Sequence, residues 1–224
     1  MTIAAGERGV AVLIAIMALL LMSALGTALI LTSTSETIIA AHFRNGIEGR
    51  YAADAMIERA MDDVATAGDW NLLIDGSLRS AWVDGPPAGM RKMTDGSTID
   101  LAQVINLANC QKSTPCSQAD LAAVTAHRPW GVNNPRWTPY AYGPLRDMLP
   151  LSGTIDSSYY VLLLVGNGPS AALLAMRAEA FGPRGAHVVV EVTAGRASLS
   201  GDEKDYNDDP GQGAMNVLSW REVR

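Results

Sequence analysis

The N-terminal region contains a long apolar run that limits what the chain can fold into. Residues 10–31 read VAVLIAIMALLLMSALGTALIL, and no charged residue occurs between Arg8 and Glu36. As a helix rising about 1.5 Å per residue, the run spans roughly 33 Å, enough to cross a hydrocarbon core of about 30 Å. A buried core helix is one alternative, although a soluble domain rarely buries so long a run at its N-terminus. A cleaved secretory signal is another, but its apolar region has only about 7–15 residues. The run therefore predicts a membrane-spanning segment.

The sequence after this run continues the helix. The first proline is Pro86, and residues 32–67 are rich in helix-forming residues. Apolar residues recur there in two series that predict one stripe. The first has four-residue steps, and the second has steps of three and four: Ile39, Phe43, Ile47 and Tyr51, then Ile57, Ala60, Met61 and Val64. We expect one helix from about Val10 to about Ala67, apolar all round over 10–31 and amphipathic over 32–67.

A short hydrophilic leader ends at Gly9, directly before Val10. This junction resembles the type III signal of type IV pilins and pseudopilins, which a membrane peptidase cuts after a glycine on the cytoplasmic side. The wider stretch, RGVAVLIAIMALLLMSALG followed by TSTSETIIAAHFRNGIEGRYAADAMIERAMDD, resembles the N-terminal region of the PilX-like minor pilins. It also resembles the K-type minor pseudopilin of type II secretion. The resemblance covers roughly residues 6–65 and implies a prepilin leader over residues 1–9, cleavage between Gly9 and Val10, and methylation of the new terminal amine.

One position departs from the ordinary pilin pattern. Pilins carry a glutamate five residues into the mature chain, where this sequence has Ile14. In a packed filament that glutamate neutralises the methylated amine of a neighbouring subunit, because an unpaired charge in an apolar core is costly. The minor pilins that the chain resembles often lack this glutamate. Ile14 therefore favours a tip or priming subunit over the major pilin.

The resemblance also implies partners and a location. The partners are other pilins or pseudopilins of the filament, the prepilin peptidase and an inner-membrane assembly platform. The location is the bacterial inner membrane, with a single span, the N-terminus in the cytoplasm, and assembly into a periplasmic or cell-surface filament. Flanking charges add little about orientation, since Glu7 offsets Arg8 while His42, Arg44 and Arg50 follow the span. A net charge of −6 with only three lysines predicts no nucleic-acid partner.

Residues 68–224 predict one α+β domain. Residues 98–110 and 116–127 favour short helices, with Ser117 as the N-cap of the second. Two segments rich in glycine, proline and asparagine, 83–90 and 127–147, are expected to be loops.

Three strand-like runs follow in close succession and predict an antiparallel meander: residues 158–168, 171–182 and 186–197. The middle run is rich in helix formers, but its connections are too short for a crossover, so we expect a strand. Residues 214–223 favour an edge strand. A long N-terminal helix packed on such a small antiparallel sheet is the architecture of pilins.

Cys110 and Cys116 are the two cysteines of the chain, in CQKSTPC. Export would place them in an oxidising compartment, where a disulfide across this short loop is expected. The alternatives are two unrelated thiols or a metal pair, and a metal pair would need further ligands that the neighbouring sequence does not supply. We expect the disulfide to staple the loop between the two short helices.

The motifs give no sign of catalysis. His42, His127 and His187 lie far apart in the sequence, and neither a G-x-S-x-G elbow nor a phosphate-binding glycine loop occurs. We therefore expect no enzyme and no catalytic residue. The segment HRPWGVNNPRW is expected to be a proline-stiffened loop pinned by Trp130 and Trp137, with partner binding as the alternative.

The acidic stretch GDEKDYNDDPGQG is the one candidate ion site. Asp205, Asn207 and Asp209 match the first, third and fifth positions of a calcium loop. The match then fails, because Pro210 replaces the required glycine and Asn216 replaces the closing glutamate. A solvated acidic loop without a cofactor is expected, and a calcium site remains the alternative.

These features predict a minor pilin-like structural subunit that helps initiate or cap a type IV pilus-type filament. One alternative is a minor pseudopilin of type II secretion. The other is a single-pass, membrane-anchored envelope protein whose domain binds a ligand. Cleavage after Gly9 separates the pilin-like interpretations from the envelope protein.

Overall fold

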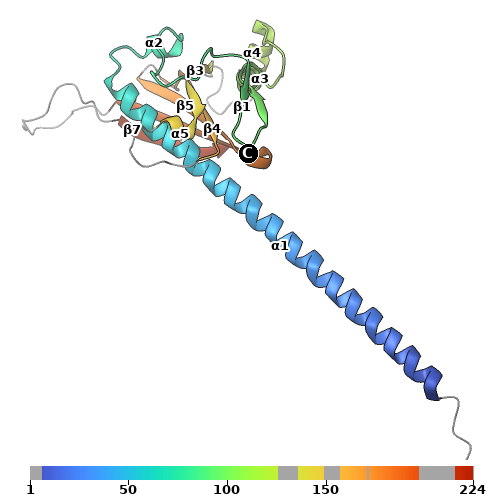
Figure 1. Cartoon of the computed structure of the whole chain (residues 1–224). Helices are drawn as coiled ribbons and strands as arrows, with labels where there is room; N and C mark the ends of the chain where they lie inside the picture. The colour runs from blue at the N-terminus through green and yellow to red at the C-terminus, as the bar shows by residue number, and fades with distance from the viewer. Residues whose placement is uncertain (1–6, 126–135, 149–156, 171, 197–214, 224) are drawn as a thin grey trace, which may run out of the picture. The chain divides into compact units, whose positions relative to one another are not determined.

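The computed structural model describes residues 7–125, 136–148, 157–170, 172–196 and 215–223. The chain divides into two compact units, residues 1–44 and 45–224. The first unit contains the N-terminal part of the long helix α1. The second contains the remainder of α1 and an antiparallel sheet, so the fold class is α+β (Figure 1).

The helix α1 (Glu7–Thr66) has 60 residues and confirms the expected long helix. It begins three residues before Val10, within the segment expected as a leader, and ends one residue before Ala67. At the usual rise it is roughly 90 Å long. Gly68 and Asp69 follow its end, and both are poor helix formers.

Five strands form the main sheet, and each pairs antiparallel with the next strand in the sequence. They are β3 (Thr138–Pro144), β4 (Tyr160–Asn167), β5 (Leu173–Phe181), β6 (His187–Arg196) and β7 (Met215–Val223). The expected meander and the expected edge strand β7 are both confirmed. The strand β5 forms despite its helix-favouring composition because it pairs along both edges, with Ala178 opposite Leu163 of β4 and Val190 of β6.

The expected loop over residues 127–147 is wrong for Thr138–Pro144, which form β3. Pro139 and Pro144 make this segment look like a loop in the sequence. Prolines are, however, tolerated in a strand at the edge of a sheet, where β3 lies. A register shift between Pro139 and Ala141 marks a bulge. Tyr140 lies at this bulge, and as a result Tyr140 and Tyr142 belong to different hydrophobic clusters.

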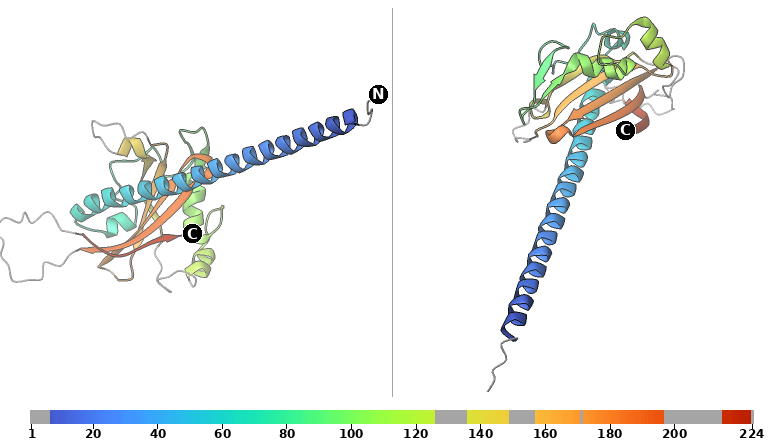
Figure 2. Two further views of the ribbon diagram at one scale, coloured as in Figure 1. Left: turned by 90° about the horizontal axis from the view of Figure 1, so that it is seen from below. Right: turned by 90° about the vertical axis from the view of Figure 1, so that its right-hand side faces the viewer.

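The sheet has an apolar cluster on each face, because successive residues of a strand point to opposite sides. In β4 the odd-numbered residues 161–165 pack in the cluster that contains residues 52–64 of α1. The even-numbered residues 160–164 pack in the cluster that contains Leu101 of α3. Figure 2 shows α1 and α3 on opposite sides of the sheet, within the second unit.

Short elements surround this sheet. They are α2 (Asn71–Ile74), β1 (Met90–Lys92), β2 (Thr98–Asp100), α3 (Leu101–Cys110), α4 (Gln118–Thr125), α5 (Leu145–Met148) and the 3₁₀ turn η2 (Pro183–Gly185). The strands β1 and β2 pair as a small antiparallel sheet.

Two expected helices are present, and the first is shorter than predicted. Residues 98–100 pair with β1 instead of starting a helix, and the Asp100 side chain then accepts a hydrogen bond from Ala102 N (3.0 Å) to cap α3. Ser117 caps α4 as expected. Its Oγ accepts from Asp120 N (3.2 Å), and the Asp120 carboxylate accepts from Ser117 N (3.0 Å), which completes a capping box.

The expectation of one apolar stripe along α1 is wrong, because its residues divide between two environments. Ile57, Ala60 and Val64 are at most 3% exposed, whereas Phe43 is 71% and Tyr51 is 69% exposed. A step of four residues turns a helix by about 400°, so a four-residue repeat drifts by about 40° at each step. The repeat over residues 39–51 therefore moves around the helix, and at Tyr51 it no longer lies on the face that packs against the sheet.

Candidate functional site

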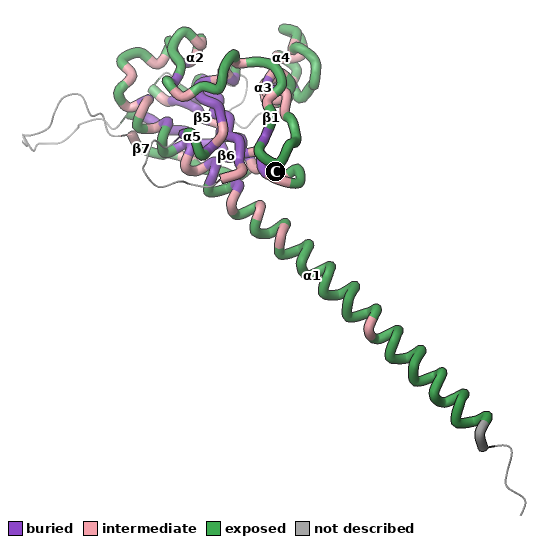
Figure 3. Tube along the Cα trace, viewed as in Figure 1, coloured by how far each residue is buried: buried purple, intermediate pink, exposed green. Residues whose placement is uncertain are grey.

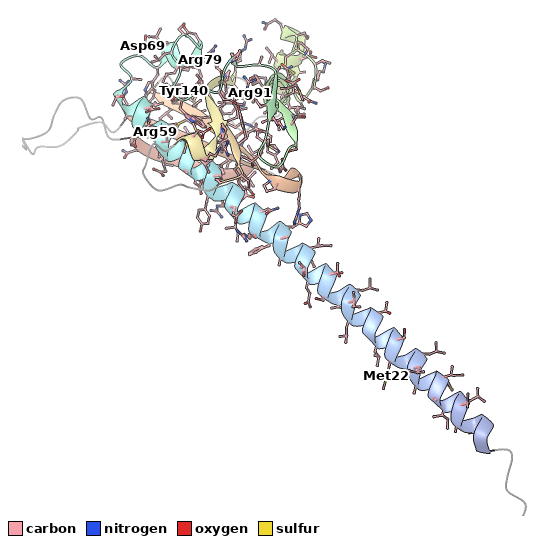
Figure 4. The ribbon with its side chains drawn as sticks, viewed as in Figure 1. Met22, Arg59, Asp69, Arg79, Arg91 and Tyr140 are labelled. Carbon is pink, nitrogen blue, oxygen red and sulfur yellow. A yellow bond between two sulfur atoms is a disulfide. The ribbon has the colours of Figure 1, made fainter. Side chains whose placement is uncertain are left out.

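The apolar segment Val10–Leu31 of α1 is the main candidate functional surface. Its large apolar side chains are between 50% exposed, at Ile16, and 71% exposed, at Met22 and Leu29. Figure 3 shows this part of α1 almost entirely in the colour of exposed residues, and Figure 4 shows the Met22 side chain projecting from the helix. By length and composition, α1 is apolar enough to cross a membrane.

Five hydroxyl groups in and after this segment donate to backbone carbonyls of the helix. Thr27 Oγ1 donates to Ser23 O (2.8 Å) and Thr32 Oγ1 donates to Ala28 O (3.0 Å). The same bond to the carbonyl four residues earlier is made by Thr34, Ser35 and Thr37. An unpaired hydroxyl in hydrocarbon is costly, so these bonds make the helix compatible with lipid or with a dry helix–helix contact.

Gly9, Val10 and Ile14 lie in the first turns of α1. Nothing lies within 4 Å of the position that a Gly9 side chain would occupy, so packing does not require a glycine there. Val10 is 56% and Ile14 is 62% exposed. Their spacing of four residues places both on one face of the helix.

The end of α1 is fixed to the domain by Arg196, the last residue of β6. Its guanidinium donates to the carbonyl groups of Ala67 and Gly68, which follow the helix, and lies 4.8 Å from the centre of the Trp70 ring. A cation at this position complements the negative end of the helix dipole. The domain therefore holds the C-terminal part of α1 by its end as well as by its buried face.

Cys110 and Cys116 form the expected disulfide, with their Cα atoms 6.0 Å apart. The bond links the end of α3 to the residue before the N-cap of α4. Between them Gln111 adopts a left-handed conformation with φ of 59°. A cleft of about 650 Å³ lies beside the disulfide, lined by Asn106, Cys116 and Trp137 among other residues.

Five charged or titratable side chains form a network on β5, β6 and β7 that the sequence analysis does not predict. Arg177 donates to Glu179 (2.7 Å) and to Glu191 (2.7 Å). Arg221 Nε donates to Glu191 (3.0 Å), and His187 Nε2 lies 2.9 Å from a Glu179 carboxylate oxygen. The network therefore joins three strands of the sheet.

The two carboxylates of this network are nearly inaccessible, with Glu179 2% and Glu191 6% exposed. Burial acts to raise the pKa of Glu179, but the bond to His187 and the charge of Arg177 outweigh it and hold that pKa below its ordinary value. The charges are thus paired, and we interpret the network as a structural link. Its one signal in the sequence is the spacing of Arg177 and Glu179, which places both on one face of a strand.

The remaining sequence-predicted residues do not come together. His42 is exposed on α1, His187 opens β6, and His127 lies outside the described residues. Trp130 and the calcium candidates Asp205, Asn207 and Asp209 also lie outside the described residues. Within the part of the chain that the structure describes, no group of three or more His, Cys, Asp or Glu side chains could hold a metal.

Trp137 is 5% exposed, which fits the expectation that this tryptophan fixes the segment to the domain. The side chain of Asn109 in α3 binds both the N–H and the carbonyl of Trp137. The Trp137 N–H donates to Asn109 Oδ1 (2.8 Å), and the Asn109 amide donates to Trp137 O (3.0 Å).

No protein-family model, no curated protein and no solved structure matches this chain.

Proposed function

We propose that this chain is a minor pilin-like structural subunit of the PilX-like kind, which helps initiate or cap a type IV pilus-type filament. The observation that carries the proposal is the difference in burial between the two parts of α1. Its segment 10–31 exposes every large apolar side chain, and its residues 52–64 enter the core of an α+β domain. In this proposal the first part holds the subunit in lipid or in a filament, and the second part displays the domain.

The proposed assembly uses side-chain packing rather than chemistry. A prepilin peptidase removes residues 1–9, and the amine of Val10 is methylated. An inner-membrane platform then moves the apolar segment from lipid into a core made of the helices of other pilins. Both surroundings are apolar, so helix association in them depends on van der Waals packing and interhelical bonds.

Ile14 supports a place at the tip or in priming. A subunit with isoleucine at this position has no carboxylate to offer the terminal amine of a neighbour. The disulfide supports export, because such bonds persist in oxidising compartments. The proposed subunit is not an enzyme, needs no cofactor and binds no nucleic acid. A minor pseudopilin of type II secretion is a second candidate of the same class, supported by the same helix.

A different class of function is favoured by the cleft beside the disulfide. Its volume of about 650 Å³ is in the range of small-molecule sites. The third candidate is therefore a single-pass, membrane-anchored envelope protein that binds a ligand in this domain.

Processing distinguishes the pilin-like subunit from the anchored envelope protein. The full chain is co-expressed with a prepilin peptidase, and the membrane-extracted protein is measured by intact mass and N-terminal sequencing. We expect it to begin at Val10 with a methylated amine. We expect Gly9→Leu to remain uncut, because a branched side chain does not fit a pocket selected for glycine.

Gly26→Leu is the matched control, since Gly26 is also a helical glycine with nothing within 4 Å of its Cβ position. This variant should still be cut. Wild-type protein that begins at Met1, or that is cut beyond Leu31, would contradict the pilin-like function.

A further inference from the structure

The turn of α1 from Asn45 to Gly49 differs from the helix on either side of it. Its sequence is NGIEG, with glycines at positions 46 and 49. Glycine is the weakest helix former after proline. The division between the two compact units also falls here, between Arg44 and Asn45.

The two glycines of this turn have different surroundings. A Cβ at Gly49 would lie 2.9 Å from Val188 Cγ2 and 3.1 Å from Tyr159 Cε1, so close packing requires a glycine there. A Cβ at Gly46 would have nothing within 4 Å. Packing therefore gives no reason for Gly46, whose direct effect is to weaken the helical turn.

Tyr159, which directly precedes β4, binds the backbone of this turn. The residue is 3% exposed, and its hydroxyl donates to Asn45 O (2.5 Å). The Tyr159 ring lies beside the other end of the turn, since its Cε1 would be 3.1 Å from a Cβ at Gly49. Tyr159 thus contacts both ends of the turn.

The surroundings of Tyr159 fix its ring in this position. A Cβ at Gly182 would overlap the ring, so the absence of a side chain at Gly182 makes room for it. The Asn45 amide in turn donates to Pro183 O (3.4 Å), in the connection between β5 and β6. A tyrosine hydroxyl is protonated at neutral pH, and burial raises the pKa of Tyr159 further above its ordinary value, so the hydroxyl remains a donor.

We propose that the Asn45–Gly49 turn is a hinge in α1, and that the Tyr159 hydroxyl holds it in the closed, helical state. When this hydroxyl releases the backbone, the turn opens while the helix before and after it stays intact. Kinks in helices are common at glycines, and this turn has two glycines and an Asn45 carbonyl that also accepts a hydrogen bond from a side-chain hydroxyl. The hinge does not depend on the filament function proposed above.

Hydrogen exchange of the full chain in detergent micelles, followed by mass spectrometry, tests the hinge. In Tyr159→Phe we expect peptides that cover residues 44–52 to exchange about fivefold to tenfold faster, the effect of one lost hydrogen bond. Peptides from residues 20–35 and 55–65 should not change. Tyr160→Phe is the matched control, because the Tyr160 hydroxyl donates to Asp84 (3.3 Å) instead of to α1.

A second variant tests the hinge without removing any contact. Gly46→Ala should slow exchange over residues 44–52 by about fivefold, because alanine strengthens the helix and meets no atom at this position. Gly26→Ala should leave these residues unchanged. The hinge is refuted if Tyr159→Phe accelerates exchange throughout the domain equally, or if residues 44–52 exchange as slowly as residues 55–65 and respond to neither variant.

Discussion

The two ends of α1 use apolar residues in opposite ways. Residues 10–31 consist largely of leucine, isoleucine and methionine, yet their side chains are exposed. Residues 52–64 contain many alanines, and the alanines at positions 52, 53 and 60 are at most 2% exposed. Hydrophobicity alone therefore does not decide which part of this helix enters the protein core. Small side chains let the helix approach the sheet closely, whereas the bulkier segment has no such partner among the described residues of its compact unit.

The difference in exposure has a large energetic consequence. Fully burying one large aliphatic side chain contributes about 1.5–3 kcal/mol, so the exposed side chains of residues 10–31 represent on the order of tens of kcal/mol. Lipid or the helices of partners can supply this burial. The second part of α1 already obtains its burial from the domain.

Two methionines allow the largest test of this comparison. Met56 is 1% exposed and Met22 is 71% exposed. Met56→Asp should destabilise the domain by about 4 kcal/mol or more, because it buries an unpaired charge. Met22→Asp should leave the thermal unfolding of the domain within about 0.5 kcal/mol of wild type. It should instead lower the fraction retained in carbonate-washed membranes, since aspartate in a spanning helix costs about 2.5–3.5 kcal/mol. Equal destabilisation of the domain by both variants would contradict the conclusion that residues 52–64, and not residues 10–31, belong to the core of the domain.

Ile14→Glu tests the first part of α1 as a packing surface. The proposed tip position has no neighbour that needs this carboxylate, so the change should bring no gain in assembly. A buried, unpaired carboxylate should weaken association by several kcal/mol at most, because protonation relieves it. The measurement is the ratio of this subunit to the major pilin in sheared filaments, for wild type and variant. A clear rise in the ratio would count against a tip position.

Alkaline pH should affect the domain but not the apolar segment. Tyr140, labelled in Figure 4, is 4% exposed, and burial together with the charge of Asp63 raises its pKa to about 12. The unfolded chain has a tyrosine pKa of about 10, so the stabilisation is complete below pH 10 and is lost as the pH rises through 12. Tyr140 should contribute roughly 3 kcal/mol of this loss in denaturation curves.

Tyr140→Phe should reduce this alkaline loss. Membrane retention should stay constant over the same range, because no charged residue occurs between Arg8 and Glu36. An unchanged loss in the variant would show that another group titrates.

The smallest effect is expected at the contact between α1 and β7. Asp54 accepts a hydrogen bond from Trp220 Nε1 (3.1 Å) and lies 3.9 Å from the Arg50 guanidinium. Asp54→Asn should cost less than about 1 kcal/mol in chemical denaturation, because this contact is partly exposed. Asp62→Asn, on an exposed position of the same helix, is the control. A loss well above that of the control would mean that β7 depends on this contact.

Local patterns in the sequence predicted much of this fold. The absence of charge and proline predicted α1, and the short turns between strand-like runs predicted the meander of β4, β5 and β6. The spacing of Cys110 and Cys116 predicted the disulfide. These features could be predicted from the sequence because helices, short turns and short loops depend on residues that are close in the sequence.

Tertiary structure decided the rest. The strand β3 contains prolines that a central strand would exclude, and it exists because it lies at the edge of the sheet. Which face of α1 is buried depends on where the sheet meets it, and not on the four-residue repeat that ends at Tyr51. Glu179 and Glu191 are buried because strand register places Arg177 opposite Glu191.

The bond from Tyr159 to Asn45 joins residues 114 positions apart. No periodicity within one segment encodes such a contact, since it arises only when helix and sheet pack together. The sequence by itself determined the long first helix, its apolar character and the meander of β4, β5 and β6. The packing of distant segments determined which side chains of that helix are buried, paired or left exposed.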